Sequence, residues 1–127
     1  MDVNACPFDF SPHGLPEIGE ARRALCESLL PEIRRVAWDL GFAVAVHGSM
    51  RRDLDLIAYP WIDTAAASAT FVRVLAEALG VPPDPPFIAP HDLKVRPRPH
   101  GREPWVIHLS SEFGDGPYLD IAIPPRV

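Results

Sequence analysis

Two aspartates stand two positions apart at the start of an otherwise apolar segment, residues 53–59. In a β-strand, residues i and i+2 point to the same face and lie about 6.6 Å apart along the chain. Asp53 and Asp55 are therefore predicted to project together, while Leu54 and Leu56 point to the opposite, buried face. Carboxylates held this close repel one another unless a cation lies between them. The pattern indicates a metal site.

A third aspartate, Asp120, lies near the centre of a second apolar segment, residues 118–123, in which Leu119, Ile121 and Ile123 form the predicted buried face. An acid in such a strand usually has a dedicated partner. If this strand lies beside 53–59, Asp120 completes a triangle with the first two aspartates. Such a triangle suits two Mg²⁺ or Mn²⁺ ions about 3.5–4 Å apart, which bridge substrate phosphates and activate an attacking hydroxyl. Alternatively, Asp120 pairs with an arginine such as Arg102 or accepts backbone hydrogen bonds.

A Gly-Ser pair precedes the first aspartate and follows a short apolar run, residues 42–46. Gly48 allows a close backbone approach, and Ser49 offers a hydroxyl and an N–H group to a phosphate. Arg51 and Arg52 lie in the following turn, where either side chain would neutralise a triphosphate. A nucleoside triphosphate is therefore the predicted ligand.

Charge is unevenly distributed along the second half of the chain. Residues 53–93 hold six acids and one base, whereas residues 94–102 hold four bases and no acid. This separation of acids from bases is expected if the carboxylates bind metal and the basic loop beside them contacts phosphate. Lys94 and Arg102 are the predicted phosphate contacts of the loop. The alternative is a solvated loop that happens to be basic.

His108 is a further candidate, because it shares a predicted strand face with Val106 and Ser110. If that face also carries Asp120, His108 lines the site. If it does not, His108 is a structural histidine that packs with its hydrogen bonds satisfied.

The periodicity of apolar residues predicts an α+β fold in the order α-β-β-α-β-β-β, with helices packed on one face of a mixed or antiparallel sheet. An irregular arm is expected over 1–16, followed by a helix from Glu17 to Gly41 that kinks or breaks at Pro31. Strands are expected over 42–46, 53–59, 92–96, 105–111 and 118–123, with a proline-rich loop over 81–90.

The second helix is expected to start at a cap formed by Asp63 or Thr64 and to end at Gly80. Four apolar residues are predicted to face inward from it: Phe71, Val74, Leu75 and Leu79.

The length of 127 residues indicates one domain, 1–127, and the net charge of −5 argues against binding to long nucleic acid. No apolar run approaches the roughly 20 residues that span a bilayer, so no membrane partner is expected. The N-terminus lacks a basic region and an apolar stretch, which predicts a cytoplasmic protein. A site on an exposed sheet face needs a second subunit or the 94–104 loop to exclude water, so a homo-oligomer is one expected assembly.

Taken together, His47-Gly48-Ser49, the Asp53-Leu54-Asp55-Leu56 segment and the later strand with Asp120 resemble the DNA polymerase beta-type nucleotidyltransferase superfamily. The resemblance covers roughly residues 18–123 and implies a small, single-domain member. It implies Gly48 and Ser49 at the nucleotide phosphates and all three aspartates as metal ligands. It further implies that Asp120 helps to deprotonate a hydroxyl acceptor, which receives a nucleotidyl group as pyrophosphate leaves.

The spacer between Ser49 and Asp53 is only three residues long, shorter than is usual in that superfamily. A shortened turn favours an alternative function, a catalytically inactive domain that binds a nucleotide or a partner protein. A metal-dependent hydrolase that uses the same carboxylates is a third reading. The acceptor, whether a small molecule or a protein, is not specified by the sequence.

Overall fold

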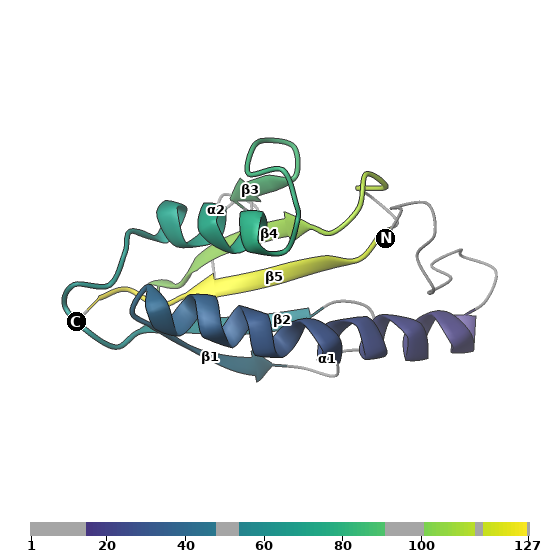
Figure 1. Cartoon of the computed structure of the whole chain (residues 1–127), viewed down its shortest axis with the longest axis horizontal. Helices are drawn as coiled ribbons and strands as arrows, with labels where there is room; N and C mark the ends of the chain where they lie inside the picture. Colours follow the sequence, from purple (N-terminus) through teal and green to yellow (C-terminus); the bar gives the residue numbers. More distant parts are fainter. Residues whose placement is uncertain (1–14, 48–53, 91–100, 114–115, 127) are drawn as a thin grey trace.

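The computed structural model describes residues 15–47, 54–90, 101–113 and 116–126 as an α+β structure with two helices and a five-stranded sheet (Figure 1). The described elements are α1 (Leu15–Asp39), β1 (Phe42–His47), β2 (Leu54–Pro60), α2 (Ser68–Ala78), β3 (Ile88–Pro90), β4 (Glu103–His108) and β5 (Tyr118–Ile123). Neither described helix is long and apolar enough to cross a membrane.

The sheet is mixed, with the strand order β1-β2-β5-β4-β3. Strands β2 and β5 run parallel at its centre, and each of the other neighbouring pairs is antiparallel. Because β2 and β5 are far apart in the sequence, their pairing is a long-range contact that joins the two halves of the chain. This pairing sets the position of the predicted site.

The core lies between one face of the sheet and the two helices. Helix α1 packs over β1 and β2, helix α2 packs over β3 and β4, and the helices contact each other (Figure 1). Alternate residues of the central strands fill this layer; they are Leu54, Leu56 and Ala58 from β2 and Leu119, Ile121 and Ile123 from β5, all buried. Phe42 of β1 and Phe71 of α2 meet in the same layer, with ring centroids 4.4 Å apart. The strand periodicity of the sequence thus predicted the buried faces of β2 and β5.

Helix α1 differs from the expectation in two ways. It begins at Leu15 rather than Glu17, and it runs unbroken through Pro31 instead of dividing into two helices. Pro31 is exposed. Ile33, Val36 and Ala37 are buried beyond it, so packing of the last two turns holds the helix together across the missing backbone donor.

An exposed ion-pair cluster lies on the last two turns of α1. Arg35 contacts Glu32 at 2.7 Å and Asp39 at 3.0 Å. The hydrogen bond from Arg35 lowers the pKa of Glu32, and the same contact raises the pKa of Arg35. Both groups are solvent-exposed, so the cluster adds little to stability.

Helix α2 starts later than predicted and presents a different face. Its N-cap is Ala67 and not Asp63 or Thr64, and no side chain caps its first turn. Phe71 and Leu75 are buried as expected, but Val74 is 36% exposed. The buried face instead includes Val72 and Ala76, because α2 packs against α1 as well as the sheet.

The last three residues of the predicted proline-rich loop form β3, which pairs with β4. The strand expected over 92–96 lies outside the described residues. The strands predicted over 105–111 and 118–123 correspond to β4 and β5, and β4 starts and ends earlier than expected.

Candidate functional site

The parallel pairing of β2 with β5 brings two of the three predicted aspartates together. Asp55 stands directly beside Asp120 in the register of this pairing. Neighbouring strands lie about 4.8 Å apart, and paired residues point to the same face of the sheet. Since Leu54 and Leu119 face the helices, Asp55 and Asp120 share the opposite face. Both side chains are half-buried.

Strand β1 contributes to the same end of the sheet. His47, the last residue of β1, pairs with Asp55, and Gly48 follows it in the chain. We use the name carboxylate face for the side of the sheet away from the helices that carries His47, Asp55, Asp120, Tyr118 and His108. On this face the two carboxylates lie between β1 on one side and β4 on the other.

His108 belongs to the carboxylate face. It pairs with Tyr118 across the β4–β5 ladder, and Tyr118 lies two positions before Asp120 on β5. The sequence does not determine which face of the sheet carries His108. The pairing of His108 with Tyr118 places it on the carboxylate face. The Nδ1 atom of His108 is buried, whereas the side chain as a whole is half-buried.

Four aromatic rings form a chain beside the carboxylates, and we call them the aromatic cluster: Phe87, His108, Phe113 and Tyr118. The ring of His108 lies 5.2 Å from that of Phe113, edge-on, and 6.0 Å from that of Tyr118. Phe87 meets Phe113 edge-on at 5.0 Å. The sequence alone does not indicate this cluster, because only the β3–β4 and β4–β5 pairings bring residues 87, 108 and 118 together.

The donor chemistry of the pair fits a hard divalent cation, because carboxylate oxygens are the ligands that Mg²⁺ and Mn²⁺ prefer. Within the described parts of the chain, no three His, Cys, Asp or Glu side chains gather closely enough to hold a metal ion. Asp53, the predicted third ligand, lies outside these parts. Asp55, Asp120, His108 and Tyr118 all take part in other polar, ionic or ring contacts.

The remaining predicted site residues divide into two groups. Gly48, Ser49, Arg51, Arg52 and Lys94 lie outside the described residues, so their roles stay predictions. Arg102 is described and half-buried, but it directly precedes β4, four positions before Val106, the residue opposite Asp120. At about 3.3 Å per residue, its Cα lies roughly 13 Å along the strand from the carboxylates. The structure therefore does not bring Arg102 to the aspartate pair.

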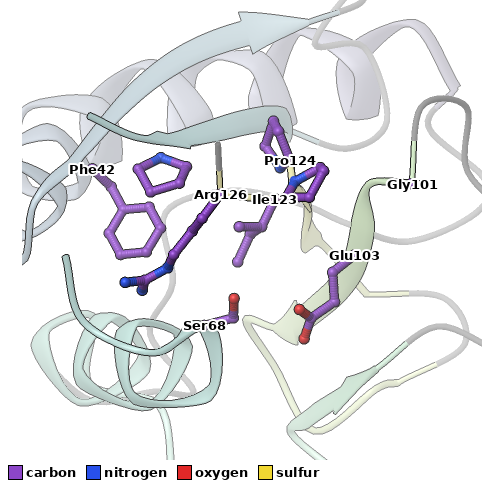
Figure 2. A pocket seen from close by; sticks show the side chains of 9 residues that line it. Phe42, Ser68, Gly101, Glu103, Ile123, Pro124 and Arg126 are labelled. Carbon is purple, nitrogen blue, oxygen red and sulfur yellow. The ribbon is translucent and has the colours of Figure 1, made fainter. Parts of the chain in front are cut away.

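A cavity of about 220 Å³ lies at the other end of the sheet, away from the carboxylates. Its walls combine apolar residues, such as Phe42, Ile123 and Pro124, with three polar side chains, which are those of Ser68, Glu103 and Arg126 (Figure 2). The Arg126 side chain crosses this region and donates to the backbone oxygen of Ala66. The Glu103 carboxylate accepts a 2.7 Å hydrogen bond from the indole N–H of Trp105. Arg126 and Glu103, two of the three polar side chains that line the cavity, thus make contacts within the fold itself, and no predicted site residue lines the cavity.

No protein-family model, no curated protein and no solved structure matches this chain. A functional assignment therefore depends on the chain's own residues and their arrangement.

Proposed function

We propose that the protein is a magnesium-dependent nucleotidyltransferase, which transfers a nucleotidyl group from a nucleoside triphosphate to a hydroxyl acceptor. One observation carries the proposal: the parallel β2–β5 register sets Asp55 beside Asp120 on the carboxylate face. The register also supports the nucleotidyltransferase fold, because β1 ends beside Asp55 and leads directly into Gly48-Ser49. The cytoplasmic location expected from the sequence would give such an enzyme access to nucleoside triphosphates.

In this proposal, Asp53, Asp55 and Asp120 hold Mg²⁺ or Mn²⁺. The bound ion would neutralise phosphate charge and polarise the bond to the leaving group. Gly48 and Ser49 bind phosphate oxygens through backbone and hydroxyl groups, and Arg51, Arg52 and Lys94 add positive charge to a carboxylate-rich face. Asp120 accepts the proton of the attacking hydroxyl.

Isothermal titration of ATP, and then of the other triphosphates, tests the proposal with and without Mg²⁺. Wild type is expected to bind only when Mg²⁺ is present, and Asp55→Asn is expected to lose this binding because it removes a charged ligand. Asp63→Asn is the matched control, since Asp63 is an exposed aspartate in the segment after β2. This variant is expected to bind like wild type.

Equally tight binding without metal, or no binding of any triphosphate, would contradict the proposal. Mg²⁺-dependent binding without pyrophosphate release in the presence of varied hydroxyl acceptors would instead support the inactive nucleotide-binding domain. The titration and the release assay together therefore separate the two functions.

A further inference from the structure

The cavity at the end of the sheet remote from the carboxylates lies where the ends of four strands meet the start of α2. Phe42 opens β1 and pairs with Pro60, the last residue of β2. Glu103 opens β4 and pairs with Ile123, the last residue of β5. Ser68, the first residue of α2, lines the same space. Every residue that lines the cavity belongs to the described part of the chain.

The walls of this cavity differ in polarity between its inner part and its mouth. Phe42 and Ile123 are buried and provide apolar surface inside it. Glu103 and Arg126 are exposed, and their side chains lie on opposite sides of Ser68 (Figure 2). No ion pair joins Glu103 to Arg126. The cavity thus combines an apolar interior with a negative and a positive group that are held apart near solvent.

Both charged groups keep hydrogen-bonding capacity for a ligand. Glu103 accepts one hydrogen bond from Trp105, and Arg126 donates one to the backbone oxygen of Ala66. A carboxylate accepts up to about four hydrogen bonds, and a guanidinium carries about five N–H donors. Within the described residues each group makes only this one bond, which fixes its position and uses a small part of its capacity.

We infer that this cavity binds a free α-amino acid with an aliphatic side chain. The ammonium group of the ligand donates to Glu103, its carboxylate meets Arg126 and the hydroxyl of Ser68, and its side chain packs on the apolar interior. A zwitterion matches both charges of the cavity, whereas a ligand with a single charge leaves one of them unmatched. The site is separate from the carboxylate face, so the inference is independent of the proposed function.

The volume of the cavity sets the size of the ligand. A cavity of about 150 Å³ holds a molecule of benzene. The cavity described here, at about 220 Å³, is roughly half as large again, which suits an amino acid of the size of leucine or isoleucine. Tryptophan is too large for it.

Isothermal titration of L-leucine into the full chain tests the inference, with three probes that each lack one part of leucine. Glycine lacks the side chain, isocaproate lacks the ammonium group, and isoamylamine lacks the carboxylate. Leucine is expected to bind with a Kd of about 1 mM or tighter. Each probe is expected to bind about tenfold more weakly, because it leaves a charge or the apolar interior without its match.

Two variants locate the bound ligand. Glu103→Gln keeps an acceptor for the indole of Trp105 and removes the negative charge, so it should weaken leucine binding about tenfold and leave isocaproate binding unchanged. Arg126→Gln should weaken the binding of leucine and isocaproate and leave isoamylamine binding unchanged.

Glu77→Gln is the matched control for the loss of a carboxylate. Glu77 is exposed and lies on α2, about 13 Å along the helix axis from Ser68, and it does not line the cavity. This variant is expected to bind leucine like wild type.

No binding of leucine at about 10 mM would overturn the inference, as would isocaproate and isoamylamine that bind as tightly as leucine. Leucine binding that is unchanged in both cavity variants, with circular dichroism showing them folded, would place the ligand elsewhere and overturn it too. The comparison of leucine with its three probes uses wild type alone, so it decides the question even if a variant does not fold.

Discussion

At the scale of single residues, Gly41 marks the tightest backbone approach in the link between α1 and β1. Its φ of +88° is a left-handed conformation that side chains disfavour. A Cβ atom at this position would lie 2.8 Å from the Cα atom of Ala65. The Gly41 carbonyl also accepts a hydrogen bond from the backbone N–H of Trp61 at 3.0 Å, so the two segments cannot move apart freely.

Gly41→Ala is therefore expected to destabilise the protein more than Gly80→Ala. Gly80 has a similar φ of +77°, but a Cβ atom there would meet nothing within 4 Å. Gly80→Ala should lower the free energy of unfolding by about 1–2 kcal/mol through backbone strain alone. Gly41→Ala should lower it by a further 1–3 kcal/mol or so through overpacking. Urea denaturation measures both losses, and equal losses would show that the approach to Ala65 does not matter.

The site residues show what a single sequence can and cannot predict. Alternation of aspartate with aliphatic residues placed Asp55 and Asp120 on the faces of their strands opposite the buried residues, because side chains alternate in any strand. The pairing of β2 with β5 could only be assumed from the sequence, because no local pattern indicates which distant strands pair. Arg102 is an example: the charge pattern grouped it with the carboxylates, and only the structure shows that it directly precedes β4, four residues before the position opposite Asp120.

At the scale of elements, α1 is stabilised by packing more than by the helical preference of its residues. Pro31 cannot donate a hydrogen bond to the carbonyl four residues earlier, yet the helix continues to Asp39. The sequence predicted a kink or break because local propensity was the only information available. The contacts of Ile33 and Val36 with the rest of the core outweigh that local cost.

Pro31→Ala is accordingly expected to raise the free energy of unfolding by about 2 kcal/mol. Proline costs about 3 kcal/mol relative to alanine inside a helix, and up to about 1 kcal/mol is offset by the stiffer unfolded chain. Pro31 is exposed, so the substitution removes no buried contact. Arg34→Ala, at another exposed position of α1, is the control and should change stability by less than about 0.5 kcal/mol. A Pro31→Ala variant no more stable than wild type in urea would show that α1 is not a single continuous helix.

Helix α2 and strand β3 were harder to predict for a related reason. The exposure of Val74 and the burial of Val72 depend on where α1 lies, which a single helix pattern does not contain. Strand β3 is three residues long and ends in a proline, so its sequence is typical of a loop. Only its pairing with β4 makes it a strand.

At the scale of the whole molecule, the two faces of the sheet differ: one packs against the helices, and the other carries the carboxylate pair. The helices and the buried residues of β2 and β5 stabilise one face, and this layer fixes the register that sets Asp55 beside Asp120 on the other. The carboxylate pair is therefore held by rigid strands and not by a loop, which suits a site that must keep two like charges close together. The cavity near Arg126 is remote from this pair.

We propose that Asp55 and Asp120 act together in one metal–nucleotide site, and water-proton relaxation on binding of Mn²⁺–ATP tests this proposal directly. Asp55→Asn and Asp120→Asn should each weaken binding at least about tenfold, as expected for the loss of a ligand. The double variant should lose little more than the weaker-binding single variant, because residues that share one site are not additive. Single variants that bind Mn²⁺–ATP like wild type, or losses that simply multiply in the double variant, would contradict a shared site.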